Sequence, residues 1–285
     1  MPEFSHFIAI DWSGAKTGYR HKLQVALCPP GRAAPRLIKR PGGWTRAGIL
    51  EWLTQDLFPQ SRALVGFDFS FAPPFLDKGA YLVGEALPGD ARGFWAYVDA
   101  CCEDADLGAA SFLESRHRRH FYFGKADGEK APYMRLRRCE RRFNAVGGGK
   151  PSSVFDAIGA AQVAKASFAG MRLLHRLAPE VAVWPFDEVG DEDGPLVVEI
   201  YCRLFLRLAG GRGVKLRSVA ALNAALARLQ SQPVAWGKAP ISDDETDALI
   251  AAAGLRHLAM NGKYWRPAGL SDSVRTREGW TFGID

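Results

Sequence analysis

The sequence of 285 residues predicts an α/β fold in which a mixed sheet of five strands, in the order 3-2-1-4-5, is flanked by helices. Short apolar runs of strand length alternate with longer segments that have helical periodicity. Three of the strand-like runs follow one another near the N-terminus, before the first helix. Apolar residues make up 47% of the chain, which is enough for a sizeable core.

The N-terminal part of the chain has the element order β-β-β-α-β. The first three apolar runs are separated by turn residues such as Pro29 and Gly31, and their close succession favours an antiparallel meander. Thr45 is a suitable N-cap for the helix that follows, in which apolar residues recur at helical spacing. We expect these strands at 6–12, 21–28, 35–40 and 62–68, and the helix at 46–58.

The stretch 71–150 differs from the rest of the sequence. It is rich in proline, glycine, aromatic residues and arginine, and its periodicity is poor. We therefore expect an insertion after strand 4 that contains short helices and belongs to a single domain spanning 1–285.

Helices and strands alternate again after the insertion. Ser152 and Ser153 are suited to open a long amphipathic helix, and Ser242 is suited to cap the last one. An acidic turn from Asp187 to Gly194 separates two strand-like runs. We expect helices at 152–178, 217–230 and 243–260, and strands at 181–186 and 196–202.

Acidic residues end or interrupt several of these apolar elements. Asp11 ends the first strand and Asp68 ends the fourth, and these two strands are neighbours in the predicted sheet. Asp244 and Asp247 are three residues apart, so they share one face of the last helix. Glu199 closes a further apolar run.

Carboxylates that converge in this way cannot all remain ionised unless a cation binds between them. We expect Asp11, Asp68, Asp244 and Asp247 to hold Mg²⁺ or Mn²⁺, with Glu199 as a further catalytic ligand. Two ions about 4 Å apart would activate a water molecule and stabilise the leaving oxygen of a phosphodiester.

Structural explanations for the same acids stay open. Capping and the helix dipole favour Asp244 at the start of its helix, and Glu199 could pair with Arg203 or Arg172. Asp247 lies one turn deeper in the helix, where capping explains it less well. The occurrence of all the acids in this order favours a metal site.

The order of these motifs resembles the RNase H-like superfamily, in particular its RuvC-type resolvase branch. Nearly the whole chain is similar to domain-of-unknown-function family 429, whose members are described as RNase H-like nucleases. This resemblance implies an RNase H-like fold and nuclease activity. One departure is Tyr201-Cys202, where the family usually has Tyr-Pro, and it makes Glu199 the least secure ligand. The matching segments are Gly66-Phe67-Asp68, Phe155 to Val163, Val198 to Tyr201, Asp244 to Leu249 and Glu278-Gly279-Trp280.

The insertion contains dense basic runs with aromatic residues among them. Such a combination is suited to bind phosphates and to stack on bases, so we expect a nucleic-acid surface there. The alternative is that these arginines pair with acids such as Glu129, Glu140 or Asp127 and hold the insertion together. The arginines that we expect to contact nucleic acid are Arg135, Arg137, Arg138, Arg141 and Arg142.

Two further motifs have simpler explanations. Gly147-Gly148-Gly149-Lys150 lacks the spacing and the preceding strand of a phosphate-binding loop, and we interpret it as a hinge. His117 and His120 have no third ligand nearby in the sequence, so we expect surface histidines.

Charge and cysteine content agree with a polyanionic partner and a reducing compartment. The net charge is +6, and the five cysteines have no paired spacing typical of zinc sites or disulfide frameworks. The N-terminus has no signal-peptide pattern, and no apolar run reaches the ~18–20 residues that span a bilayer. We therefore expect a cytoplasmic protein.

The sequence favours a metal-dependent nuclease that acts on DNA or RNA. A non-catalytic nucleic-acid-binding module of the same fold is one alternative, and an actin-like phosphotransferase is another. The latter shares the first strand and its turn but normally needs a second copy of the fold. The substrate and the oligomeric state stay open.

Overall fold

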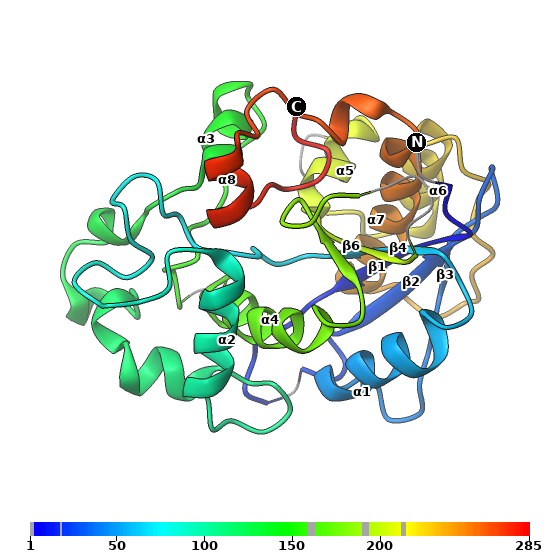
Figure 1. Ribbon diagram of the computed structural model, residues 1–285. Coiled ribbons are helices and arrows are strands. Elements are labelled where there is room, and N and C mark those ends of the chain that lie inside the picture. The colour runs from blue at the N-terminus through cyan, green and yellow to red at the C-terminus, as the bar shows by residue number, and fades with distance from the viewer. Residues whose placement is uncertain (1–2, 18, 159–162, 190–193, 212–214) are drawn as a thin grey trace.

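A mixed six-stranded sheet forms the centre of the computed structural model, which describes residues 3–17, 19–158, 163–189, 194–211 and 215–285 (Figure 1). The strand order is β3-β2-β1-β4-β6-β5. The pairs β1–β2 and β2–β3 are antiparallel, whereas β1–β4, β4–β6 and β5–β6 are parallel. The strands are β1 (His6–Asp11), β2 (Gln24–Cys28), β3 (Arg36–Leu37), β4 (Ala63–Phe67), β5 (Ala182–Trp184) and β6 (Leu196–Glu199).

The mixed α/β sheet agrees with the prediction, but the predicted five-strand order 3-2-1-4-5 is wrong. The predicted strand at 196–202 lies beside β4, and the one at 181–186 forms an additional edge strand beyond it. All four residues of β6 are buried, whereas β5 has three residues and begins with a partly exposed one. The inner strand β6 is buried along its whole length, because a parallel strand between two neighbours is covered on both faces.

Helices cover both faces of the sheet (Figure 1). Because side chains alternate along a strand, Ile8 and Ile10 of β1 belong to one core, and Phe7 and Ala9 belong to the other. The first core is closed by α1 (Arg46–Glu51), its π-helical continuation Trp52–Leu57, α2 (Ala91–Cys101) and α4 (Val163–Leu177). The second core is closed by α5 (Cys202–Leu208), α6 (Val219–Arg228) and α7 (Asp243–Ala259).

Two predicted caps are confirmed. The hydroxyl of Thr45 accepts a hydrogen bond of 2.9 Å from the Gly48 amide at the start of α1. At the start of α7 the Ser242 hydroxyl accepts from the Glu245 amide at 3.2 Å, and the Glu245 carboxylate accepts from the Ser242 amide at 2.9 Å. This reciprocal capping box fixes the first turn of α7.

Most predicted elements are shorter in the structure, and two of these differences bear on the site. The helix predicted at 152–178 is α4, which begins at Val163, and residues 159–162 lie outside the described part. Before it, backbone hydrogen bonds join Phe155 and Ala157 to Tyr122 in a short parallel bridge, which replaces helical bonding. The strand predicted at 196–202 ends at Glu199, and α5, which the sequence reasoning missed, begins three residues later.

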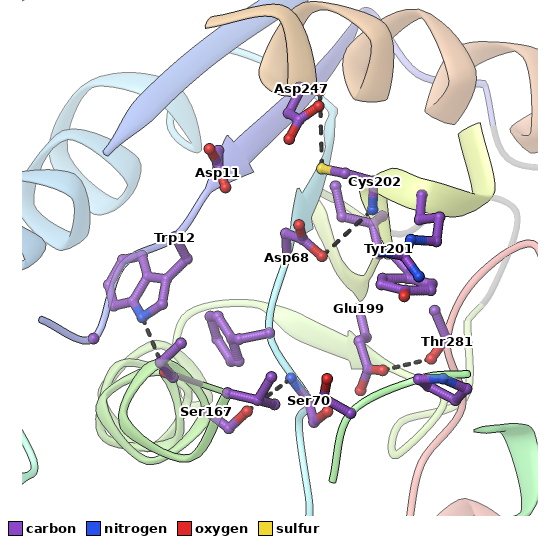
Figure 2. A pocket seen from close by; sticks show the side chains of 18 of the residues that line it. Asp11, Trp12, Asp68, Ser70, Ser167, Glu199, Tyr201, Cys202, Asp247 and Thr281 are labelled. Atoms are coloured by element: carbon purple, nitrogen blue, oxygen red, sulfur yellow. Dashed lines mark hydrogen bonds between the residues drawn. The ribbon is translucent and has the colours of Figure 1, made fainter. Parts of the chain in front are cut away.

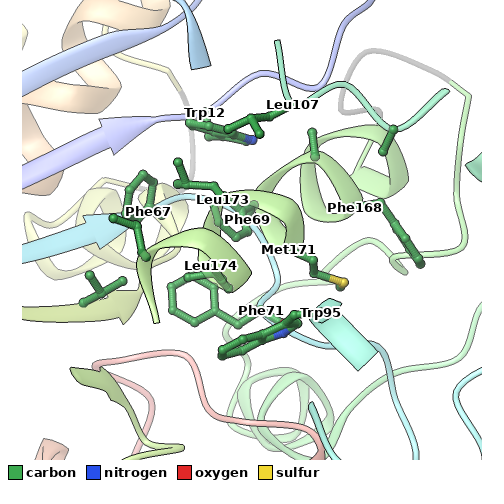
Figure 3. Packing of buried hydrophobic residues seen from close by; sticks show 14 of the residues in the cluster. Trp12, Phe67, Phe69, Phe71, Trp95, Leu107, Phe168, Met171, Leu173 and Leu174 are labelled. Atoms are coloured by element: carbon green, nitrogen blue, oxygen red, sulfur yellow. The ribbon is translucent and has the colours of Figure 1, made fainter. Parts of the chain in front are cut away.

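Side chains of the insertion 71–150 join the core on the α4 face. The Phe168 ring of α4 contacts the rings of Phe94, Phe112 and Phe121, with centroid distances of 5.0–6.1 Å. The Trp95 indole donates a hydrogen bond of 2.6 Å to the Phe71 carbonyl, and Figure 3 shows both side chains beside α4. The insertion and the sheet therefore share one hydrophobic core.

Smaller elements complete the insertion and the C-terminal region. The insertion contains α3 (Arg138–Ala145), the π-helical turn Phe112–Arg116 and 3₁₀ turns at Arg118–His120, Lys125–Asp127 and Ala131–Tyr133. The tail contains the 3₁₀ turn Gly262–Tyr264 and α8 (Asp272–Arg277). All five cysteines are free. Within the described ranges, no helix has the length and apolar character to cross a membrane.

Candidate metal centre

Asp11 and Asp68 lie side by side at the carboxyl ends of neighbouring parallel strands. The register pairs Ile10 with Phe67, and the Asp68 amide donates a hydrogen bond of 3.1 Å to the Ile10 carbonyl. The two aspartates are therefore adjacent and lie on the same face of the sheet, the face that α7 covers (Figure 2). This part of the predicted cluster is found in the structure.

The loop after β1 is held against α4, which fixes the position of Asp11. The Trp12 indole donates a hydrogen bond of 3.1 Å to the Ala166 carbonyl. A Cβ atom on Gly14 would lie 2.0 Å from the backbone carbon of Lys165, so only glycine permits this approach.

The first two turns of α7 bring Asp244 and Asp247 to the same cavity as the strand-end aspartates. The Oδ2 atom of Asp247 lies 3.4 Å from the ammonium of Lys215. Its Oδ1 atom is buried and makes no hydrogen bond within the described chain. A buried carboxylate oxygen without a partner is costly unless a cation or a donor binds it.

Burial and mutual repulsion disfavour the charged forms of these carboxylates. Burial, followed by the charges of Asp68, Asp244 and Asp247, raises the pKa of Asp11 well above its usual value. Burial is also the main reason that the pKa of Asp68 rises to about 6, although hydrogen bonding to Cys202 opposes this shift. Burial raises the pKa values of Asp244 and Asp247, and the charge of Lys215 lowers both.

Glu199 does not join these aspartates. It is in register with Phe67, one position before Asp68, so its side chain lies on the opposite face of the sheet. Its carboxylate accepts hydrogen bonds from the Phe71 amide at 2.7 Å, the Thr281 hydroxyl at 2.5 Å and the Arg137 guanidinium at 2.5 and 2.7 Å. Both oxygens are therefore engaged, and neither Arg203 nor Arg172 is the partner.

Two arginines of the predicted nucleic-acid surface instead form ion pairs and hydrogen bonds within the protein. Arg137 is 1% exposed and bridges Glu199 and Glu140, the latter at 3.0 Å. Arg135 pairs with Asp77 at 2.6 and 2.9 Å and donates to three backbone carbonyls. For these two residues the phosphate-contact prediction is wrong, and the alternative, that arginines hold the insertion together, describes the structure.

The other three predicted arginines are exposed, but they lie on the outer side of α3. Arg138, Arg141 and Arg142 line a hollow between α3 and α8. Arg137, Glu140 and Phe143 instead line the cavity that contains the aspartates. The helix therefore separates the exposed arginines from the carboxylates.

Different cations line the aspartate cavity, which has a volume of about 570 Å³. Lys22, Lys150 and Arg203 are exposed at its wall, and Lys215 is half-exposed beside Asp247. The sequence reasoning missed these four residues as a group, because they come from four separate loops and helix ends. The one sequence feature that pointed to any of these cations was Lys150, which ends the segment Gly147-Gly148-Gly149-Lys150 after α3.

The chemistry of the donor set fits a hard divalent cation. Carboxylate oxygens are the ligands that Mg²⁺ and Mn²⁺ prefer, and Asp247 Oδ1 is a buried oxygen without a partner. Among the described residues, the aspartates do not bring three carboxylate oxygens within 4.8 Å of one another.

The prediction that His117 and His120 are surface histidines without a third ligand is wrong. His117 is buried, and Glu85 approaches both imidazoles. These three residues form the one group of potential metal ligands in the described chain whose ligand atoms all lie within 4.8 Å of one another.

No protein-family model, no curated protein and no solved structure matches this chain. The resemblance to domain-of-unknown-function family 429 and the RNase H-like superfamily therefore stays a prediction from sequence.

Proposed function

We propose that this protein is a metal-dependent nuclease that hydrolyses phosphodiester bonds of nucleic acid, on an RNase H-like fold. The observation that carries the proposal is the position of Asp11 and Asp68 at adjacent strand ends, in register and on the face where α7 presents Asp244 and Asp247. Four aspartates around one cavity are costly without a cation, and their oxygens suit Mg²⁺ or Mn²⁺.

The aspartates would hold the metal ions, and the cations around them would hold the substrate. Bound Mg²⁺ or Mn²⁺ would supply a water molecule of lowered pKa and would stabilise charge on the leaving oxygen. Lys22, Lys150 and Arg203 would contact phosphates at the cavity wall. Lys215 holds Asp247 by one oxygen and leaves the other free for a ligand.

Glu199 has a positioning role in this proposal. Its carboxylate is filled by Arg137, Thr281 and the Phe71 amide, so we leave it out of the ligand set. Through Arg137 it ties the start of α3 to the sheet. Arg137 and Glu199 line the same cavity as the aspartates, so this contact helps to shape its wall.

The test is metal-dependent cleavage of a panel of branched DNA, RNA–DNA hybrid, and single-stranded DNA and RNA. We expect cleavage of at least one substrate with Mg²⁺ or Mn²⁺ and none with chelator. Asp11→Asn should reduce this cleavage to background while the fold persists. Asp56→Asn changes an exposed aspartate of the Trp52–Leu57 turn and should cleave like the parent protein.

Two outcomes would contradict the proposal. Cleavage by Asp11→Asn at the rate of the parent protein would remove the aspartates from the reaction. Tight nucleic-acid binding with no cleavage of any substrate in either metal would favour the non-catalytic binding module.

A further inference from the structure

A second group of potential metal ligands lies within the insertion. The Oε1 atom of Glu85 lies 3.0 Å from Nε2 of His120 and 3.6 Å from Nδ1 of His117. His117 caps the 3₁₀ turn Arg118–His120 and His120 ends it, so the two histidines are three residues apart, a spacing that is eclipsed in a 3₁₀ helix. Both imidazoles therefore face Glu85, which comes from a loop more than 30 residues earlier in the chain.

These distances match those between ligands of one tetrahedral ion. Zinc–nitrogen and zinc–oxygen bonds of about 2.0–2.2 Å place neighbouring ligand atoms roughly 3.3 Å apart. The observed 3.0 and 3.6 Å lie on either side of that value. Two of the three pairs of ligand atoms therefore have the spacing of a shared ion, and the atoms of the third pair, His117 and His120, lie within 4.8 Å of each other.

The His117 ring supplies an independent observation. The residue is 3% exposed, and its Nδ1 atom is buried and makes no hydrogen bond within the described chain, although it faces Glu85. Its other nitrogen, Nε2, lies 3.0 Å from the Tyr97 hydroxyl. With Nε2 protonated and donating to Tyr97, Nδ1 presents a lone pair to the cluster, as in the outer-shell contacts that orient histidine ligands.

We propose that Glu85, His117 and His120 form a binding site for a divalent transition metal of the Zn²⁺ class, separate from the aspartate cavity. Two imidazoles and one carboxylate select such an ion over Mg²⁺, which prefers oxygen ligands. Glu85 and His120 are partly exposed, which gives a path of entry and leaves a coordination position for solvent. The bound ion would join the Glu85 loop to the turn at 118–120.

Arg119 competes with the ion for the same carboxylate. Its guanidinium donates to Oε1 of Glu85 at 2.7 Å and lies 3.2 Å from Nε2 of His120. The Arg119 side chain is 66% exposed, so it can turn into solvent at little cost when the ion binds. Removal of Arg119 is therefore expected to strengthen metal binding, whereas it would loosen a cluster held only by polar contacts.

The experiment measures the affinity of the full chain for Zn²⁺ by competition with a chromophoric chelator. We expect one tight Zn²⁺ per chain, which Asp11→Asn retains. His120→Ala and Glu85→Gln should weaken this binding by about 100-fold, since loss of outer-shell partners alone costs 10- to 100-fold. Arg119→Ala should tighten it. His21→Ala, which removes an exposed histidine elsewhere, should not change it.

The opposite results would overturn the proposal. These are no stoichiometric Zn²⁺ binding by the parent protein, parental affinity in His120→Ala and Glu85→Gln, or weaker binding in Arg119→Ala. All of these variants change partly or fully exposed side chains, so circular dichroism can establish that they remain folded. Loss of the tight Zn²⁺ in Asp11→Asn would instead assign the ion to the aspartate cavity.

Discussion

At the scale of single residues, the aspartates are held in an arrangement that opposes their ionisation. Asp11 and Asp68 are adjacent in register, and both face α7. Burial raises the pKa of each, and the neighbouring aspartates add to the effect for Asp11. A cation in the cavity would reverse this preference, because it stabilises the carboxylate form.

The pKa of Asp68 predicts how the stability of the metal-free protein depends on pH. Its value of about 6 exceeds the usual 3.8, so the folded state binds more protons than the unfolded state between these pH values. The contribution of Asp68 to the free energy of unfolding is present below pH 4 and is lost as the pH rises through about 6. This shift of the Asp68 pKa from 3.8 to about 6 corresponds to about 3 kcal/mol in the free energy of unfolding.

Asp68→Asn is the variant for this measurement, because the amide oxygen can still accept from the Cys202 amide. We expect denaturant unfolding with chelator present to show that the variant gains stability over the parent protein as the pH rises from 4 to 7. A constant difference between the two proteins over that range would contradict the raised pKa.

Metal affinity should rise over the same pH range, because the ligands must lose their protons before they bind. Titration with Mn²⁺ at pH 5 and pH 7 checks this expectation. Equal affinity at the two pH values would argue against the aspartates as ligands.

At the scale of elements, one buried ion-pair network joins α3 to the sheet. Arg137 immediately precedes α3 and contacts Glu199 of β6 and Glu140 of α3 itself. Glu278, also buried, accepts hydrogen bonds from the amides of Phe75, Leu76 and Arg138. These contacts fasten the insertion to both the sheet and the C-terminal segment.

Removal of Arg137 should therefore destabilise the protein strongly. Arg137→Met leaves two carboxylates buried without their cation, and breaking such a pair costs about 3–5 kcal/mol. Denaturant unfolding measures the change. Arg138→Ala is the matched control and should stay within about 0.5 kcal/mol of the parent protein, since its side chain is exposed. A mild effect of Arg137→Met would contradict this account of the insertion.

At the scale of the whole molecule, two groups of basic residues face different surfaces. Lys22, Lys150 and Arg203 line the aspartate cavity, whereas Arg141 and Arg142 line the hollow between α3 and α8. If nucleic acid runs past the aspartates, the first group contacts it.

Salt dependence distinguishes the two surfaces. Replacing Lys22, Lys150 and Arg203 with alanine should weaken polynucleotide binding for all sequences alike. It should also reduce the slope of log K against log salt by about 0.9 per lost contact on duplex DNA. Arg141→Ala with Arg142→Ala should leave the slope unchanged. The reverse pattern would assign the nucleic acid to the hollow beside α8.

Metal binding should also stabilise the whole fold, since the aspartates come from β1, the end of β4 and α7. An ion that binds only the folded state adds about 2.7 kcal/mol at 100 times its Kd. Thermal unfolding with and without Mn²⁺ measures the change, and Asp11→Asn should show a smaller shift. No shift at millimolar Mn²⁺ would favour a non-catalytic protein.

The sequence by itself determined the features that depend on near neighbours in the chain. Apolar runs placed the central strands, and Thr45 and Ser242 marked the starts of α1 and α7. Asp11 and Asp68 followed from the ends of two strands that were predicted to be neighbours, and the spacing of Asp244 and Asp247 placed both in the first turns of α7. These inferences succeeded because strand periodicity and helix capping act over a few residues.

Only the tertiary structure decided which distant residues meet. The inner position of β6, the face on which Glu199 lies and its pairing with Arg137, 62 residues away, depend on register and on competition for buried space. The same holds for Glu85 and His120, which are 35 residues apart. A shift of one residue in register moves a side chain to the other face of a sheet, and no local pattern records that choice.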